Sequence, residues 1–313
     1  MKKLCIQSAD IPHFFGKQKA YQMIADAGFS AIDWNLDHAW TVAEGKAVEE
    51  YGEVKSCILD KPLDEVLAFY AEEIAAIKAA GLKVAQAHSV FPSYRSYLAS
   101  TYVDYAIECH KKLMYVCREV GCPYLVVHGI NYDLDFDADD REKIDKLNMH
   151  MYESLIPTAL ETGVTVCLEN IFFNSKGRII SGMCGEAAEA VEWVDKLNRK
   201  AGAECFGFCL DTGHLFLLRR DISVFIETLA HRIKCVHIHD NDGSDDAHMA
   251  PYTGKLPWFE FYTAMNRIGY NGYLSFETFM HFRKVEKALV PEILRHVAKI
   301  GEFFAQEIYG DEK

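Results

Sequence analysis

Short apolar runs alternate with longer amphipathic segments along this chain, and this alternation restricts the fold more than any other feature. It is typical of repeated strand–helix units, in which helical crossovers join parallel strands. Eight runs are predicted to be strands: Leu4–Ser8, Ala31–Asn35, Leu82–Ala87, Tyr124–His128, Val164–Glu169, Phe206–Asp211, Cys235–His239 and Gly272–Glu277.

The segments between these strands carry apolar residues at helical spacing. The predicted helices are Leu63–Ala80, Tyr102–Val120, Ile144–Thr162, Glu186–Arg199, Ile222–Leu229, Trp258–Ile268 and Val285–Phe304. Glycines that would end a helix stand before several strands, at Gly28, Gly81, Gly121, Gly163 and Gly269. Eight units in 313 residues predict an α/β fold, one (β/α)8 TIM barrel that forms a single domain over residues 1–313. An open doubly wound sheet is the alternative, but neither a G-x-G-x-x-G nor a G-x-x-x-x-G-K-[ST] motif supports it.

The net charge and the cysteine pattern limit the partners and the compartment. With 46 acidic and 33 basic residues, the formal charge of −13 would repel a nucleic-acid backbone, and no basic run offsets it. The ten cysteines include no C-x-x-C pair, which predicts reduced thiols in a cytoplasmic protein. Because the sequence has neither a signal-peptide pattern nor an apolar run long enough to cross a membrane, we expect a soluble protein without a membrane partner.

Six of the predicted strands end in residues that can bind a metal ion. These residues are His88, His128, Glu169, Asp211, His237 and Glu277. In a barrel the carboxyl ends of the strands meet at one mouth, where the catalytic residues of this fold lie. One such residue alone would usually be an ordinary structural polar group. Six together would leave buried charges uncompensated without a cation, so we predict a divalent-cation site.

Four short motifs resemble those of a known superfamily, the xylose isomerase-like TIM barrels, which include sugar and sugar-phosphate isomerases and epimerases, such as D-tagatose 3-epimerase, and endonuclease IV. The motifs are LEN at 168–170, CLDTGH at 209–214, HIHD at 237–240 and SFET at 275–278. The resemblance implies that Glu169, Asp211, His237 and Glu277 bind the metal ion of the ketose epimerases. His239 faces the same side as His237; it is the second choice as a metal ligand and is predicted to bind the substrate. Three carboxylates and one imidazole suit Mn²⁺, Mg²⁺, Co²⁺ or Zn²⁺.

Endonuclease IV holds three zinc ions, and its further ligand positions also match residues of this chain. They are His88, His128, His214, Asp246 and His248, so the resemblance leaves room for more than one metal ion. The rest of that enzyme's motifs differ here: SVFPSY follows His88, and DTGH and HIHDND replace D-T-C-H and H-x-N-D-S-K. We therefore expect one metal ion, with the extra histidines contacting the substrate.

The resemblance to the epimerases also implies a mechanism. The metal ion would polarise a carbonyl and a neighbouring hydroxyl of a small sugar or sugar derivative and so stabilise an enediolate. Glu169 and Glu277 would remove and return the proton, from opposite faces in an epimerase. Three alternatives stay open: a zinc phosphodiesterase of the endonuclease IV type, a lyase that acts on a keto-sugar or glycoside with the same metal site, and a sugar-binding barrel without turnover.

Aromatic side chains could stack on the sugar. Trp34 and Trp258 are predicted to do so, ahead of Trp40, Phe91 and Tyr94. Two long polar segments, Leu36–Lys61 and Asn131–Arg141, are predicted to cover the catalytic face. A homo-oligomer is compatible with these features.

Overall fold

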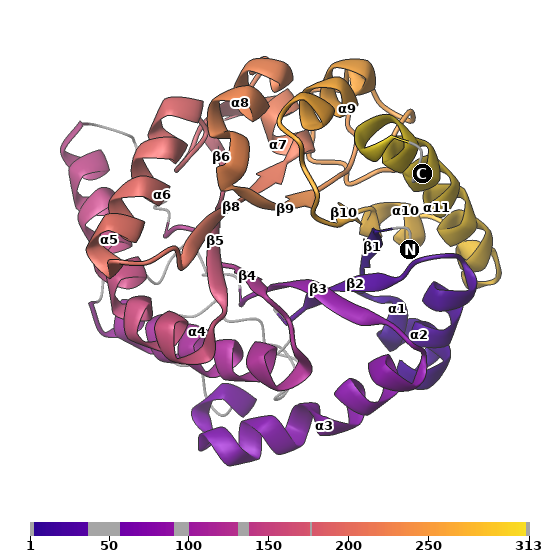
Figure 1. The fold of residues 1–313 in the computed structure, drawn as a ribbon, viewed down its shortest axis with the longest axis horizontal. Helices are drawn as coiled ribbons and strands as arrows, with labels where there is room; N and C mark the ends of the chain where they lie inside the picture. The colour runs from indigo at the N-terminus through magenta and orange to yellow at the C-terminus, as the bar shows by residue number, and fades with distance from the viewer. Residues whose placement is uncertain (1–2, 37–56, 91–99, 131–137, 176, 311–313) are drawn as a thin grey trace.

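The chain folds into a (β/α)8 barrel (Figure 1). The structure is a computed structural model that describes residues 3–36, 57–90, 100–130, 138–175 and 177–310. The barrel strands are β1 Leu4–Gln7, β2 Ala31–Asn35, β3 Lys83–His88, β4 Tyr124–Val126, β5 Thr165–Glu169, β8 Phe206–Asp211, β9 Ile233–His237 and β10 Leu274–Phe276. Each of them overlaps a strand predicted from the sequence.

All neighbouring barrel strands run parallel, in the order β10-β1-β2-β3-β4-β5-β8-β9. The ring closes between β9 and β10, where Ile238 N donates to Ser275 O at 2.8 Å and Glu277 N donates to Ile238 O at 3.0 Å. The closed ring confirms the predicted barrel and excludes the open doubly wound sheet. Because the strands are parallel, their carboxyl ends meet at one mouth.

Helices surround the barrel (Figure 1). They are α1 Ile11–Phe15, α2 Lys17–Asp26, α3 Leu63–Ala79, α4 Ser100–Val120, α5 Ala138–Thr162, α6 Ala187–Ala201, α7 Thr212–Leu217, α8 Ile222–Leu229, α9 Trp258–Arg267, α10 Phe279–Arg283 and α11 Val290–Tyr309, with short 3-10 turns at Ile58–Asp60, Ala230–Arg232 and Lys287–Leu289. Every predicted helix overlaps one of these. The last begins at Val290 and not at Val285, which places Pro291 in the first turn, where its missing N–H costs least.

Several elements were not predicted. The helix α2 buries only Ala20, Tyr21 and Ile24, too few residues to give a clear period. The strands β6 Phe172–Ser175 and β7 Arg178–Ser181 form an antiparallel hairpin between β5 and α6. Four-residue strands inside a connecting segment give little periodic signal. Both predicted covering segments fall largely outside the described residues, as do Trp40, Phe91 and Tyr94.

The backbone conformation confirms the glycines that were predicted to end helices. Gly28, Gly81, Gly121, Gly163 and Gly269 all have positive φ, from 66° to 107°. Residues with a side chain rarely adopt this conformation, so glycine is needed where each helix turns toward the next strand.

Strand residues alternate between two environments. Leu168 and Leu210 belong to the large apolar cluster that includes the helices, whereas their neighbours Cys167 and Cys209 belong to a small separate cluster with Val126 and Cys235. Successive side chains of a strand point to opposite faces, so the second cluster lies inside the barrel. All ten cysteines are described and buried, and none of them forms a disulfide bond.

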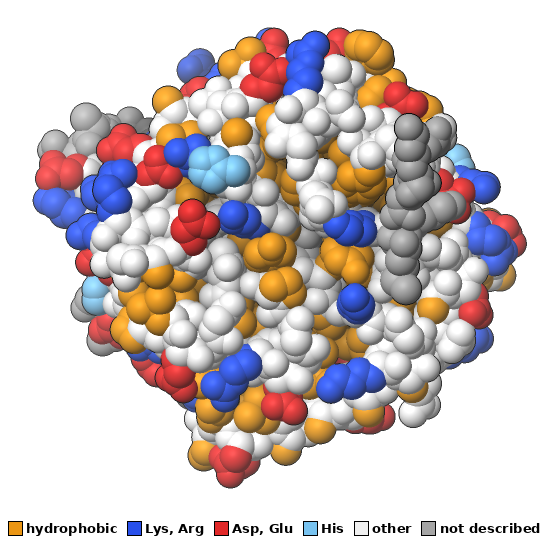
Figure 2. Space-filling view, in the orientation of Figure 1, with side chains coloured by type: hydrophobic (Ala, Val, Ile, Leu, Met, Phe, Trp, Pro, Cys, Tyr) orange, Lys and Arg blue, Asp and Glu red, His pale blue; other side chains and the backbone are white. Residues whose placement is uncertain are grey.

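The described surface mixes charges of both signs. On the face seen in Figure 2, basic and acidic side chains are interspersed, and no continuous basic band crosses the described part of that face. Among the described residues, no helix is both long enough and apolar enough to cross a membrane.

Candidate functional site

The mouth of the barrel gathers buried histidines and carboxylates. They come from the ends of six strands, and they are His88, His128, Glu169, Asp211, His237 and Glu277. Each is at most 8% exposed. The structure therefore brings together all the strand-end residues that the sequence singled out.

Four of these side chains form a compact inner group. The Nδ1 atom of His237 lies 3.0 Å from Glu169 Oε1, 3.6 Å from Glu277 Oε2 and 4.0 Å from Asp211 Oδ2. The four residues come from β5, β8 and β9 and from the residue after β10. They are the residues that the sequence predicted as the metal site.

Local hydrogen bonds explain the conformation of the LEN and DTGH motifs. Asn170 Nδ2 donates to Asp211 O, and Asp211 N donates to Asn170 Oδ1, both at 2.9 Å. Asp211 also caps α7, because its Oδ1 accepts from His214 N at 2.7 Å. A Cβ at Gly213 would collide with the ring of His239, so this turn needs glycine. The Nε2 atom of the His239 ring lies 3.0 Å from each carboxylate oxygen of Asp211.

A second group consists of His88, His128 and Glu169, and it shares Glu169 with the inner group. His128 Nε2 lies 2.9 Å from His88 Nε2 and 2.7 Å from Glu169 Oε2. Burial lowers the pKa of His88 to about 4, and His128 adds to the effect. His88 is therefore a neutral imidazole near pH 7.

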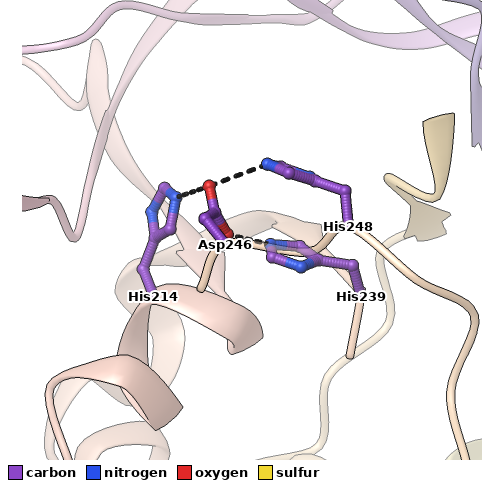
Figure 3. A group of neighbouring side chains, drawn as sticks. All are labelled: His214, His239, Asp246 and His248. Carbon is purple, nitrogen blue, oxygen red and sulfur yellow. Dashed lines mark hydrogen bonds and ion pairs between the residues drawn. The ribbon is translucent and has the colours of Figure 1, made fainter. Parts of the chain in front are cut away.

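A third group consists of His214, His239, Asp246 and His248 (Figure 3). Asp246 Oδ2 lies 2.9 Å from His248 Nε2 and 3.4 Å from His214 Nε2, and Asp246 Oδ1 lies 3.8 Å from His239 Nε2. His248 has a φ of 42°, which a residue with a side chain rarely adopts. The loop between β9 and α9 thus holds His248 in a strained conformation, as is common at functional sites.

Backbone carbonyl groups orient three of the histidines. Nδ1 of His88, His214 and His248 lies 2.8, 2.9 and 3.2 Å from a backbone carbonyl oxygen. A carbonyl oxygen can only accept, so each Nδ1 carries a proton, and in the neutral ring Nε2 carries a lone pair. Metal-binding histidines are usually held in this way.

The inner carboxylates have opposite pKa shifts. Burial alone would raise the pKa of Glu169, but His237 and His128 outweigh it and hold that pKa well below its usual range. Burial raises the pKa of Glu277 to about 8, against the lowering effect of His237. Burial would lower the pKa of His237, yet Glu277 and Glu169 raise it well above its usual value. In the cation-free protein, a protonated His237 therefore balances part of the carboxylate charge.

The donor atoms of the mouth fit a divalent cation. The carboxylates of Glu169 and Asp211 are held ionised and buried, a state that needs compensating positive charge. Among the described residues, buried Asp246 Oδ1 and His239 Nδ1 have no hydrogen-bond partner. Carboxylate oxygens and imidazole nitrogens are ligands for Mn²⁺, Co²⁺ and Zn²⁺.

Several residues near the site were not predicted. Gln7 Nε2 donates to Glu277 Oε1, and Asp33 Oδ2 lies 3.0 Å from His237 Nε2. Both stand one residue after an isoleucine of the outer core, so strand alternation could have placed them inside the barrel. Two partly buried aromatic rings flank the third group. The ring centroid of Phe172 lies 5.0 Å from that of His214, and the ring centroid of Phe279 lies 4.2 Å from that of His248.

The two tryptophans predicted to contact a sugar lie in the core. Trp34 is 0% exposed, and its Nε1 donates to Glu73 of α3 at 3.2 Å. It follows inward-facing Asp33 in the strand and therefore faces outward, toward the helices. Trp258 is 3% exposed and packs on Phe304 of α11. Neither position supports the predicted contact with substrate.

Comparisons with known proteins agree with this architecture. A family model described as xylose isomerase-like TIM barrel matches residues 22–299. The uncharacterized protein y4fM of Sinorhizobium fredii is 23% identical over 277 residues, which cover 84% of this chain and 81% of that protein. A putative hydroxypyruvate isomerase of Streptomyces coelicolor is 24% identical over 256 residues, which cover 81% of this chain and 82% of that protein.

Solved structures share the fold across nearly the whole chain. The 3-keto-D-glucoside 4-epimerase from E. coli matches with a TM-score of 0.69 at 16% identity, covering 97% of this chain and 100% of that one. A D-tagatose 3-epimerase-like protein matches with a TM-score of 0.66 at 19% identity, covering 96% of this chain and 98% of that one. Because the family model covers most of its length, the chain belongs to the family of xylose isomerase-like TIM barrels.

Proposed function

We propose that this protein is a metal-dependent isomerase or epimerase of a small sugar or sugar phosphate, working through an enediolate. The observation that carries the proposal is the convergence of Glu169, Asp211 and Glu277 on the Nδ1 atom of His237, within 4.0 Å. A divalent cation in this group would polarise a carbonyl and the adjacent hydroxyl, which acidifies the C–H bond between them.

The proposed ligands of the cation are Glu169, Asp211, His237 and Glu277. We prefer His237 to His239 because its Nδ1 faces all three carboxylates, whereas His239 Nε2 lies between Asp211 and Asp246. Ligand chemistry alone does not select among Mn²⁺, Mg²⁺, Co²⁺ and Zn²⁺.

The two glutamates are suited to opposite roles in proton transfer. In the cation-free protein Glu169 is ionised, whereas burial keeps Glu277 largely protonated near pH 7, with its pKa about 8. A bound cation would lower the pKa of both carboxyl groups, so their roles in the loaded enzyme rest on their positions. They also come from β5 and β10, which β8 and β9 separate in the ring. Glu169 would remove a proton from one side, and Glu277 would return one from the other.

The remaining polar groups of the mouth would bind the substrate. His214 and His248 lie at the partly aromatic edge of the site, next to Phe172 and Phe279. Imidazole nitrogens there would bind sugar hydroxyls, and the rings offer an apolar face for the C–H groups of a sugar. The similar proteins, a putative hydroxypyruvate isomerase, a D-tagatose 3-epimerase-like protein and a 3-keto-D-glucoside 4-epimerase, are named for hydroxy-carbonyl substrates of this kind.

Solvent-deuterium incorporation tests the proposal. The purified chain, loaded with Mn²⁺, is incubated in D₂O with a panel of ketoses, ketose phosphates and keto-sugar glycosides. We expect deuterium at one carbon next to the carbonyl of at least one compound, and loss of this exchange in Glu169→Gln and Glu277→Gln. The control is Glu73→Gln, which alters a buried carboxylate bonded to Trp34 and remote from the inner group. Elimination products would indicate a lyase, and no exchange with any compound would contradict the proposal.

One observation favours a second candidate, a zinc phosphodiesterase. The three groups of the mouth are linked, because Glu169 belongs to the inner and second groups and Asp211 contacts His239 of the third. Such linked groups could hold several ions and activate a water molecule against a phosphate ester. Elemental analysis of the purified protein discriminates: about three tightly bound zinc ions with cleavage of an abasic-site oligonucleotide would favour it. The charge of −13 argues against a nucleic-acid substrate.

A further inference from the structure

Asp33 is a buried carboxylate of β2 that lies behind the inner group. It is 0% exposed. Its Oδ2 accepts from Gln86 Nε2 at 2.9 Å and from Ser275 Oγ at 3.4 Å, and it lies 3.0 Å from His237 Nε2. Three groups from β3, β9 and β10 therefore meet this one oxygen.

The position of Asp33 makes His237 different from His88, His214 and His248. Nδ1 of His88, His214 and His248 faces a neutral carbonyl, which leaves Nε2 of these rings to face the site. In His237 the two nitrogens have exchanged places: Nδ1 faces the carboxylates of the inner group, and Nε2 faces the Asp33 carboxyl group behind it. His237 is thus the histidine of this set whose nitrogen on the side away from the inner group faces a carboxyl group and not a backbone carbonyl.

We propose that Asp33 is the positioning residue of the cation site: its carboxyl group, 3.0 Å from His237 Nε2, keeps the ring proton on Nε2 and so leaves the Nδ1 lone pair for the bound cation. In the cation-free protein the contact is an ion pair without hydrogen-bond geometry. This inference rests on the proposed function, because it requires a cation in the inner group. A carboxylate behind a metal-binding histidine fixes its tautomer and increases its basicity, and losing such a partner typically lowers metal affinity about 10- to 100-fold.

The contacts of Asp33 favour this indirect role over direct coordination. Its Oδ2 already faces Gln86, Ser275 and His237, which lie on three different strands. Gln86 Nε2 also lies 3.2 Å from Val236 O, the residue before His237, so the amide ties the carboxylate to the same strand end. The network keeps the position of Asp33 fixed without any contribution from substrate.

Mn²⁺ affinity, measured by competition with a metal chelator, tests the role of Asp33. We expect Asp33→Asn to bind Mn²⁺ about 10- to 100-fold more weakly than the unaltered chain. The matched control is Glu73→Gln, which neutralises another buried carboxylate close to the same strand through its bond to Trp34. We expect this control to change the affinity less than about threefold. Equal losses in both variants, or no loss in Asp33→Asn, would overturn the inference.

A double-mutant cycle shows whether Asp33 acts through His237. We expect His237→Ala to weaken Mn²⁺ binding, and Asp33→Asn to add less than about a threefold further loss in that background. Losses that multiply would contradict a role through His237.

If Asp33→Asn does not fold, the unaltered protein still provides a test. In the Zn²⁺-loaded chain with ¹⁵N-labelled histidine, the ring signals of His237, assigned by their loss in His237→Asn, should show the proton on Nε2 and the metal on Nδ1. The opposite assignment would overturn the inference. Failure of the unaltered chain to bind any divalent cation would instead contradict the proposed function itself.

Discussion

Two neighbouring layers of the barrel interior have the same burial but opposite chemistry. The mouth layer contains Glu169, Asp211 and His237, and the layer below it contains the residues two positions earlier on the same strands, namely Cys167, Cys209 and Cys235. All six are at most 3% exposed. Side chains two residues apart on a strand share a face, so the layers differ in depth and not in direction.

The difference lies in what each layer needs for stability. Burial raises the pKa of the Cys209 and Cys235 thiols well above the usual value, so they stay neutral and pack as small apolar groups. The carboxylates of Glu169 and Asp211 in the mouth layer stay charged through histidine partners. The thiol layer needs no ligand to stay buried, although Cys209 Sγ lies within 4.8 Å of ligand atoms of Glu169 and His237. The mouth layer is built around compensating charge. Residues two positions apart on the same strand therefore belong to an apolar packing layer and to the candidate metal site.

The largest expected effect comes from comparing Asp211→Asn with Cys209→Ala, two changes on one strand. Asparagine keeps an oxygen that can cap α7, but it removes a charged cation ligand. We expect Mn²⁺ affinity to fall more than about 100-fold, beyond the 10- to 100-fold loss typical of an outer partner. Cys209→Ala should leave the affinity within about threefold. Chelator competition measures the Mn²⁺ affinity of both variants. Similar losses in the two would mean that the thiol layer and the mouth layer do not differ in cation binding.

The pH dependence of cation binding should be almost as large. Cation binding displaces protons from Glu277, whose pKa burial raises to about 8, and from His237, whose pKa is raised despite burial by Glu277 and Glu169. Fewer protons compete as the pH rises, so affinity should increase, by up to about tenfold per pH unit for each displaced proton below pH 8. Isothermal titration calorimetry between pH 6 and 9 checks the sign. The thiol layer stays neutral there, so affinity that falls with pH would contradict this view of the mouth layer.

Gly213→Ala should lower the Mn²⁺ affinity of the mouth layer less than Asp211→Asn does. The added methyl group would collide with the ring of His239 and push it from its place beside Asp211. We expect about a tenfold loss of Mn²⁺ affinity and a loss of about 1–3 kcal/mol in the free energy of unfolding. The control is Gly207→Ala in β8, where the new methyl meets the flexible side chain of Lys234. Chemical denaturation and metal titration of both variants separate the two effects; equal behaviour would count against a specific role for Gly213.

Cys167→Ala should have the smallest effect on binding. The residue lies two positions before Glu169 and contacts the apolar thiol layer. We expect the free energy of unfolding to fall by about 1 kcal/mol, as for removal of one small buried group. Mn²⁺ affinity should not change. A urea-denaturation series together with a metal titration gives both values, and a clear loss of affinity would mean that the lower layer supports the site directly.

Much of the fold and of the site could be predicted from the sequence. The apolar runs marked all eight strands, and closure of the barrel brings Glu169, Asp211, His237 and Glu277 together whatever the loops do. These residues could be found because several metal-competent side chains stand at the same end of successive strands.

The partners of these residues were harder to predict. Asp33 is an ordinary aspartate in a strand until the position of His237 is known, because their contact joins β2 to β9 across the barrel. Trp34 was assigned to the substrate because it stands near a strand end, but alternation turns it toward Glu73 and the helices. His248 depends on the conformation of a long loop, and a φ of 42° has no signature in the sequence.

The anomalous scattering of Mn²⁺ in a crystal of the loaded protein tests the central claim most directly. We predict a strong peak in the mouth layer, about 2.0–2.5 Å from carboxylate oxygens of Glu169, Asp211 and Glu277 and from Nδ1 of His237. A loaded crystal without a peak among these four residues, or with its metal bound only elsewhere, would contradict the account.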